Sequence, residues 1–216
     1  MKNTSPKADP RKRYFSKKEA IDFGFEVAKS NLIYFISVLV IAIVVVGFFG
    51  SLQFLAGRNA MLIFLVVILR TIISLVISMG FIKISLLFVD KKKTEISDLF
   101  YIKPIVNYFL VSIIRGFIVL VGFIFLIIPG IILSIKFGFA EYLVVDKNMS
   151  VVDSLNNSWE ITKGVKWNLF LFGILLFLIN MVGFIALLVG LFITVPLTMV
   201  ANAYVYRKLY SQTTLK

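Results

Sequence analysis

The chain contains no cysteine and no histidine among its 216 residues. Their absence excludes disulfide bonds, thiol nucleophiles and imidazole bases, and it removes the commonest ligands of transition metals. The sequence also lacks a Walker A motif, a Gly-x-Ser-x-Gly elbow and a His-Glu-x-x-His pair. We therefore predict that the protein is not an enzyme and that it carries no cofactor and no metal ion.

Charged side chains are also scarce, at 16% of the residues, whereas 60% of the residues are hydrophobic. A soluble core of this size needs far less apolar surface, so the composition predicts an integral membrane protein. A membrane-spanning helix takes about 20 mostly apolar residues, and the apolar stretches are long enough for about six. The net charge of +12 does not indicate nucleic-acid binding, because basic cytoplasmic loops of a membrane protein produce the same excess.

Short charged segments separate four apolar stretches, at 31–55, 60–89, 104–145 and 167–206. The last two are about 40 residues long, and a helix of that length would extend about 60 Å, twice the thickness of the hydrocarbon layer. Each is expected to fold back, the first in a tight turn at Pro129-Gly130 and the second between Met181 and Gly190. We predict an all-α, polytopic membrane protein in which residues 31–206 form one domain of six transmembrane helices, arranged as three hairpins.

Lysine and arginine are distributed unevenly over this predicted topology. Nineteen of the 23 lie on the side that holds both termini, and the opposite side has only Arg58. The positive-inside rule then predicts a multi-pass protein of the cell membrane with a cytoplasmic basic segment at 1–30 and a cytoplasmic tail at 207–216. The basic segment is expected to contact anionic lipid headgroups, since each basic residue near a membrane surface contributes about 1 kcal/mol of binding.

A degenerate threefold repeat runs through the sequence. Ser16 with Glu19, and Ser150 with Asp153, have the spacing of a helix N-cap, which predicts interfacial helices near 17–29 and 150–163, with a shorter version at 94–104. The second and fourth helices are predicted to end alike, in LFVDK at 87–91 and LVVDK at 143–147. These similarities indicate three parallel units, each an interfacial helix followed by a hairpin, around an axis along the membrane normal. The alternative is that any hairpin with basic flanks looks this way.

Arg115, Lys136 and Glu141 are charged residues inside the predicted spans, and Glu141 is the only acidic residue there. An unpaired charge near the bilayer centre costs at least about 2.5 kcal/mol, so each cation needs a partner. Counting from the predicted turn places Arg115 and Glu141 within about 4.5 Å along the hairpin axis. We predict that Glu141 is the shared counter-ion of both cations. Two interpretations stay open: a buried ion pair that fixes helix packing, and a polar cavity or ion path.

Ser85, Glu141 and Asn202 share a position, since each stands five residues before a charged residue at the inner end of an even-numbered helix. If the repeat holds, all three face one axis, and together with Arg115 and Lys136 they form a candidate binding site. Otherwise they are polar residues of the kind that bond neighbouring helices.

Residues 128–167 carry a distinctive order of features: IPGIIL at 128–133, Ser158-Trp159 on the predicted interfacial helix, and TKG at 162–164. This order resembles a family of six-helix bacterial membrane domains that occur alone or fused to glycerophosphodiester phosphodiesterases. The resemblance implies a multi-pass protein of the bacterial membrane with no known chemistry. In the fused members the catalytic residues belong to a soluble domain that this sequence lacks, so the resemblance supplies no catalytic residue.

Two functions are consistent with these features. The first is a non-catalytic integral membrane protein that organises lipid or a membrane-protein partner. The second is a transporter of a small solute or a lipid, with a polar site around Arg115, Lys136 and Glu141. They differ in one structural expectation: a transporter needs these side chains to line a cavity that water can reach, whereas an organising protein can keep them sealed between packed helices.

Overall fold

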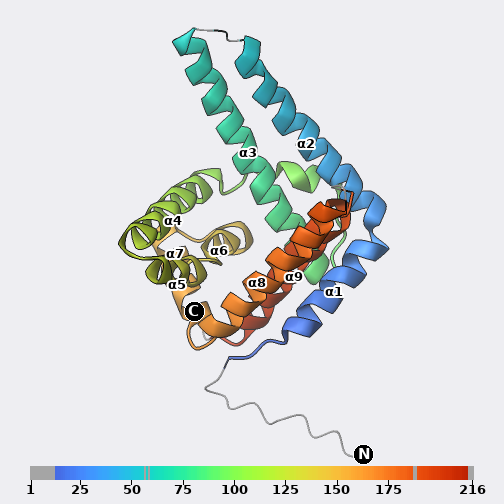
Figure 1. Cartoon of the computed structure of the whole chain (residues 1–216), viewed down its shortest axis with the longest axis vertical. Coiled ribbons are helices and arrows are strands. Elements are labelled where there is room, and N and C mark those ends of the chain that lie inside the picture. Colours follow the sequence, from blue (N-terminus) through green and yellow to red (C-terminus); the bar gives the residue numbers. More distant parts are fainter. Residues whose placement is uncertain (1–12, 56, 58, 187–188, 214–216) are drawn as a thin grey trace, which may run out of the picture.

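The computed structural model describes residues 13–213 except 56, 58, 187 and 188. Every regular element in this part of the chain is a helix, as the sequence predicted. In chain order these are α1 (Lys17–Ser30), α2 (Leu32–Leu55), α3 (Ala60–Val89), the 3-10 helix η1 (Ile96–Phe100), α4 (Ile105–Phe125), α5 (Ile127–Lys136), α6 (Ala140–Lys147), α7 (Val151–Thr162), α8 (Lys166–Ile185) and α9 (Leu191–Ser211). Figure 1 shows α2 and α3 side by side, extending away from the other helices.

Five segments of the described chain are long and apolar enough to cross a membrane. They are Leu32–Phe54, Ala60–Val89, Ile105–Phe125, Ile127–Lys147, which combines α5 and α6, and Lys166–Ile185. The protein is therefore an all-helical, membrane-embedded protein. The predicted sixth span corresponds to α9, which is less apolar because it carries Asn202, Arg207 and Lys208.

The turn between α4 and α5 does not lie at Pro129-Gly130, so that prediction is wrong by a few residues. The chain reverses at Leu126, whose φ of −168° and ψ of 157° are extended. Pro129 is the third residue of α5, in the first helical turn, where a missing N–H leaves no helical bond unmade. Gly130 allows close contact instead, because a Cβ there would collide with the ring of Phe123 on α4.

A break at 137–139, which the sequence analysis did not foresee, divides the predicted fourth span into α5 and α6. Ser158 of α7 fills the gap: its hydroxyl donates to the carbonyl of Lys136 at 2.8 Å and accepts from the N–H of Phe139 at 3.1 Å. Thr162 Oγ1 lies 3.4 Å from the same Lys136 carbonyl. Two residues that carry the family resemblance thus satisfy backbone groups that the break would leave unpaired.

The two predicted interfacial helices are present as α1 and α7. The hydroxyls of Ser16 and Ser150 accept from the N–H groups of Glu19 and Asp153, each at 3.2 Å, as the predicted N-caps require. Residues 1–12 of the predicted basic segment lie outside the described residues. α9 continues to Ser211 and so includes the first residues of the predicted tail at 207–216.

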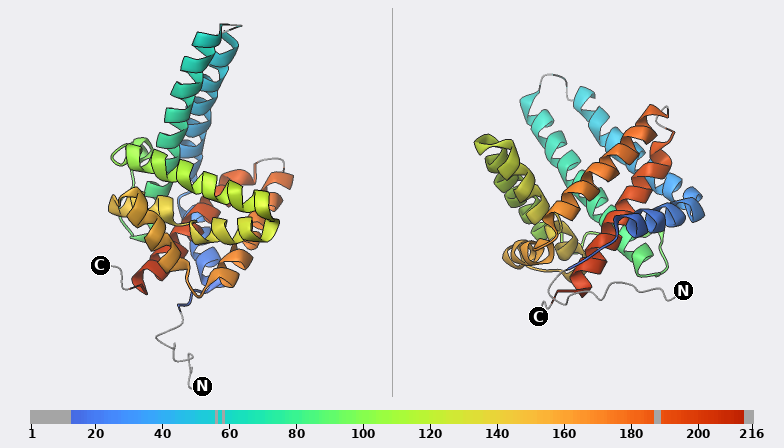
Figure 2. Two further views of the ribbon diagram at one scale, coloured as in Figure 1. Left: turned by 90° about the vertical axis from the view of Figure 1, so that its left-hand side faces the viewer. Right: turned by 60° about the horizontal axis from the view of Figure 1, so that its bottom comes forward.

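The leading helix of each predicted unit packs on the closing helix of a different unit, and the three pairings form a cycle. α1 packs on α9, η1 on α3 and α7 on α6, so each unit's leading helix contacts the closing helix of the unit before it. The right panel of Figure 2 shows the pairs α2–α3, α4–α5 and α8–α9 diverging from a base that contains the short helices. Two of these pairings join consecutive helices, so the contact of α1 with α9 is the one that closes the cycle and favours the threefold repeat.

The contact points of this cycle also correspond in sequence. In each pairing, the leading helix contacts a residue that lies ten positions before a charged residue near the end of the preceding unit. The contacted residues are Gly80, Lys136 and Leu197. The corresponding charged residues are Asp90, Asp146 and Arg207. A Cβ at Gly80 would collide with the backbone of Leu99 in η1, and one at Gly24 in α1 would collide with the Leu197 carbonyl. Close backbone approach therefore fixes two of the three contacts.

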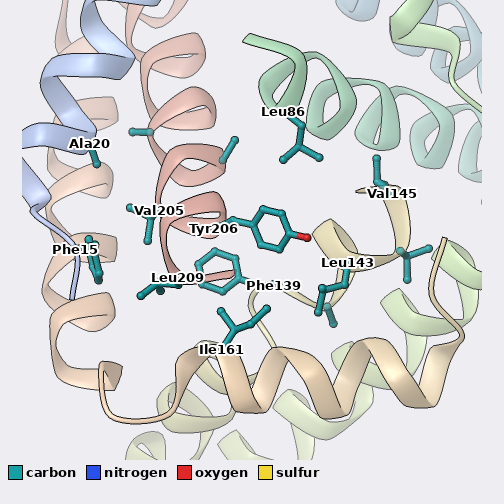
Figure 3. Packing of buried hydrophobic residues seen from close by; sticks show 14 of the residues in the cluster. Phe15, Ala20, Leu86, Phe139, Leu143, Val145, Ile161, Val205, Tyr206 and Leu209 are labelled. Atoms are coloured by element: carbon teal, nitrogen blue, oxygen red, sulfur yellow. The ribbon is translucent and has the colours of Figure 1, made fainter. Parts of the chain in front are cut away.

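The core lies where the closing helices meet α7 and α1. Figure 3 shows Tyr206 of α9 pointing toward α6, with Phe139, Leu143 and Ile161 packed around it. Tyr206, Leu143 and Ile161 are completely buried. This core holds together the end of the molecule opposite the diverging helix pairs.

Candidate functional site

A polar cleft of about 480 Å³ lies between α3 and α4. α2 contributes Gln53 to it and α6 contributes Glu141. The other lining residues come from α3 and α4: Val67, Arg70, Thr71, Ser74, Leu75, Ser78, Tyr108 and Ser112.

A stripe of polar residues along α3 forms one wall of the cleft. Thr71, Ser74 and Ser78 are spaced by three and four positions, which places them on one face of the helix. The hydroxyls of Thr71 and Ser78 donate to the carbonyls four residues earlier, both at 2.8 Å. These internal bonds lower the cost of holding polar side chains in an apolar environment. The sequence analysis did not single out this stripe, although its spacing is visible in the sequence.

Arg70 lies at the level of α2 residue Gly50, where a Cβ would be 3.9 Å from the guanidinium. In the part of the chain that the structure describes, no carboxylate lies within the 4.0 Å of an ion pair with Arg70. The cleft therefore contains one cation whose charge no described acidic side chain neutralises.

Arg115 and Glu141 form the predicted ion pair, with Arg115 Nη1 at 3.2 Å from Glu141 Oε1. Ser112 donates to the same carboxylate oxygen at 3.0 Å. The two charged side chains are 30% and 21% exposed, so the pair is neither fully buried nor free in solvent. It forms although the turn lies at Leu126, because the break before α6 directs Glu141 back toward α4.

Lys136 does not share Glu141, so the prediction of a common counter-ion is wrong for this cation. Its ammonium lies 3.5 Å from the centroid of the Trp159 ring on α7, in a cation–π contact. Lys136 is the last residue of α5, and the break that follows leaves it on the side of α7. The aromatic face of Trp159 stabilises its charge in place of a carboxylate.

Ser85 and Glu141 line a second cavity of about 330 Å³, together with Tyr142 and Met199. It adjoins the polar cleft, because Ser78, Tyr108 and Glu141 line both. Asn202, the third member of the predicted set, is not among the lining residues, and Met199 represents α9 there instead. The structure therefore brings two of the three residues together.

A cluster of charges that the sequence analysis missed joins α3, α6 and α9. Arg207 bonds both carboxylate oxygens of Asp90, at 2.8 and 2.7 Å, and both oxygens of Asp146, at 2.5 and 2.8 Å. Tyr206 adds a hydrogen bond to Asp146 at 2.9 Å. Asp90, Asp146 and Arg207 occupy equivalent positions of the predicted repeat, and we call them the Arg207 clamp. The described residues contain no group of three or more acidic residues that could hold a metal ion.

An apolar groove of about 560 Å³ lies next to the polar cleft, also between α3 and α4. α3 lines it with Val67, Ile68, Thr71, Ile72 and Leu75, and α4 with Ile105, Val106, Phe109 and Leu110. Val67, Thr71 and Leu75 line both the groove and the cleft. The gap between α3 and α4 therefore connects an apolar surface with a polar interior.

A family model described as a domain of unknown function, DUF7847, matches residues 102–214, which is more than half of the chain. The chain belongs to the DUF7847 family. No curated protein and no solved structure matches it.

The DUF7847 match covers α4 to α9, and with them Arg115, Glu141 and Arg207. The polar stripe of α3 and Asp90 lie before it. The cleft and the Arg207 clamp are therefore built jointly by the DUF7847 region and by the helices that precede it.

Proposed function

We propose that this protein is a non-catalytic membrane protein that binds a phospholipid of the surrounding bilayer between α3 and α4. The observation that carries the proposal is the shared wall of Val67, Thr71 and Leu75, which puts a polar cleft and an apolar groove side by side. An amphiphile can place its headgroup in the cleft and an acyl chain along the groove, where each part meets a surface of its own polarity.

The charges of the cleft suit a phosphodiester. Arg115 neutralises Glu141, so the three side chains of Arg70, Arg115 and Glu141 have a net charge of about +1. This charge is equal and opposite to that of a phosphodiester. A guanidinium binds phosphate oxygens through paired hydrogen bonds. Ser74, Ser78 and Tyr108 can contact the uncharged parts of the headgroup.

We place the protein in the cell membrane with six spans, arranged as three hairpins, and with both termini in the cytoplasm. The support is the distribution of lysine and arginine, together with the cycle of α1, η1 and α7 at one end of the molecule. α9 would be the sixth span, and the amphipathic helices α1 and α7 would lie at the cytoplasmic interface. This arrangement agrees with the resemblance to six-helix bacterial membrane domains, to which we propose a distant relationship.

Cysteine accessibility scanning tests this topology, because the chain has no natural cysteine. Single cysteines at Lys92 and Asn148 should react with a membrane-impermeant maleimide only after the cells are opened. A cysteine at Gly57 should react in intact cells. Labelling of position 92 or 148 from outside would contradict the proposed orientation.

Transport of a lipid or a small solute is the second candidate function. Glu141 lines the polar cleft and the adjoining cavity, and its side chain stays 21% exposed, which favours a path for a polar group. Vesicles containing the protein and a fluorescent phospholipid distinguish the two functions: transfer of the lipid between leaflets supports transport, and binding without transfer supports an organising role.

Phospholipid retention tests the proposed function. The protein is purified in a mild detergent, and bound lipid is measured by native mass spectrometry. We expect wild type to retain a phospholipid and Arg70→Gln to bind it about ten-fold more weakly, because a lost charge-assisted hydrogen bond is worth about 1.5 kcal/mol.

Lys103→Gln is the matched control, since it removes one positive charge from an exposed residue outside the cleft. It should retain lipid as wild type does. Ser74→Leu fills the cleft without changing charge and should also reduce retention. Equal retention by all four proteins would contradict a lipid site in the cleft, and a co-purified membrane protein in place of lipid would favour a protein partner.

A further inference from the structure

Another polar pocket, distinct from the cavities described above, lies among the ends of α3, α6 and α9 and has a volume of about 360 Å³. It shares no lining residue with the cleft between α3 and α4. Six of its eight lining residues are charged: Lys83, Asp90, Lys92, Asp146, Lys147 and Arg207. So dense a set of charges in one pocket is not required by a membrane location alone.

The pocket has an excess of positive charge. Four cations and two carboxylates line it, which leaves a net charge of +2. Both carboxylates are committed to Arg207, at 2.5 to 2.8 Å. Neither Asp90 nor Asp146 is therefore free to neutralise the lysines fully.

The three lysines make only longer contacts, and the ammonium of Lys147 also lies 5.1 Å from the centroid of the Tyr210 ring. Lys92 lies 4.0 Å from Asp90 and Lys147 lies 3.6 Å from Asp146, both longer than the contacts of Arg207. Lys83 makes no ion pair within the described part of the chain, and its ammonium lies 5.2 Å from the centroid of the Tyr101 ring. Such side chains can turn toward an anion with little loss of existing contacts.

Tyr101 contacts Lys83 without supplying a negative charge. Burial raises the pKa of the Tyr101 phenol, and the nearby Asp146 carboxylate raises it further. The ring is therefore neutral at physiological pH, and its face can hold the ammonium without neutralising it. The positive charge of Lys83 remains available to a ligand.

We propose that this pocket binds a phosphate monoester, through Lys83, Lys92 and Lys147. A phosphate monoester carries about −1.5 to −2 charges at pH 7, which matches the net charge of the pocket, and it offers three acceptor oxygens. The group can belong to a soluble phosphorylated compound or to a lipid with a terminal phosphate. The hydrogen bonds of Arg207 to Asp90 and Asp146 hold the ends of α3 and α6 together at this pocket.

Thermal unfolding in detergent tests the site with two probes. Glycerol 3-phosphate is the soluble probe, compared with glycerol and sodium chloride at the same ionic strength. Phosphatidic acid in mixed micelles is the lipid probe, compared with phosphatidylcholine. A ligand that binds only the folded protein raises the melting temperature in a saturable way. A rise with both probes identifies the phosphate as the feature bound, and a rise with phosphatidic acid alone identifies a lipid headgroup.

Substitutions of the lysines test whether the probes bind in this pocket. Lys83→Gln should weaken the binding of either active probe about ten-fold, and Lys83→Gln with Lys147→Gln should abolish it. Lys29→Gln, which removes a charge from an exposed residue of α1, should change nothing. No saturable rise with either probe would overturn the proposal, as would an undiminished rise in the double variant.

The phosphate pocket and the phospholipid cleft are separate proposals, and the experiments can contradict either one without the other. Arg70→Gln should leave the response to glycerol 3-phosphate or phosphatidic acid unchanged, because Arg70 does not line the pocket. Lys83→Gln should leave phospholipid retention in the cleft unchanged for the corresponding reason. A variant that lost both properties would indicate one shared site and would contradict the assignment of a separate phosphate pocket.

Discussion

Arg207→Leu is expected to lower the unfolding free energy by about 4 kcal/mol, the largest effect of any substitution proposed for this protein. Arg207 is 21% exposed and makes four hydrogen bonds to Asp90 and Asp146, so its loss leaves these two partly buried carboxylates with only the longer contacts to Lys92 and Lys147. The melting temperature in detergent should fall by about 10 °C. Arg207→Lys should lose about half as much, because an ammonium cannot bond both carboxylates bidentately.

Neutralising the stranded acids should reverse part of this loss. Asp90→Asn and Asp146→Asn, added to Arg207→Leu, should recover about 2 kcal/mol, because the penalty arises mainly from unpaired charge. Lys208→Leu is the neighbouring control, and it should change stability little, because its partner Glu19 is exposed. If the triple variant were less stable than Arg207→Leu alone, the Arg207 clamp would not be held by charge pairing.

Glu141→Gln is expected to give the second largest loss of stability, about 3 kcal/mol. The substitution removes the counter-ion of Arg115, which lies 3.2 Å away within α4. Adding Arg115→Leu should recover much of the loss, because no charge is then stranded. Adding Lys136→Leu should not, since Lys136 rests on Trp159 and not on Glu141.

Thermal unfolding is measured for Arg115→Leu, Lys136→Leu, Glu141→Gln and the two double variants that combine Glu141→Gln with either cation change. Their combination gives a coupling energy for each pair. A large coupling for Arg115 and none for Lys136 is expected. Equal coupling for both cations would mean that Lys136 shares the carboxylate after all.

The long apolar helices could be predicted from the sequence because hydrophobic length in a membrane is set by the bilayer. The turn at Leu126 could not, because Pro129 and Gly130 suit a turn and also suit the first turn of a helix packed closely on its neighbour. The only local signal of the break between α5 and α6 is Gly138, which the sequence analysis did not use. The break depends on the hydroxyl of Ser158, which is distant in sequence and stabilises the interrupted backbone.

The Arg115–Glu141 pair was predictable because an intramembrane charge needs a partner and only one carboxylate was present. Lys136 was assigned wrongly because a tryptophan face also stabilises a cation, and sequence spacing does not show which of the two lies nearer. The Arg207 clamp was missed for a different reason. Charges at the ends of spans are expected to face water, so the matching positions of Asp90, Asp146 and Arg207 in the repeat were not connected.

Photo-crosslinking in native membranes tests most directly whether a lipid enters between α3 and α4. A photoreactive amino acid at Ser74 should form an adduct that contains the glycerophosphate part of a phospholipid, because Ser74 lines the polar cleft. At Phe64, which is 64% exposed, adducts should contain acyl chains, and at Ser158, which is completely buried, no lipid adduct should form. Acyl adducts at Phe64 with no phospholipid adduct at Ser74 would contradict the proposed lipid site.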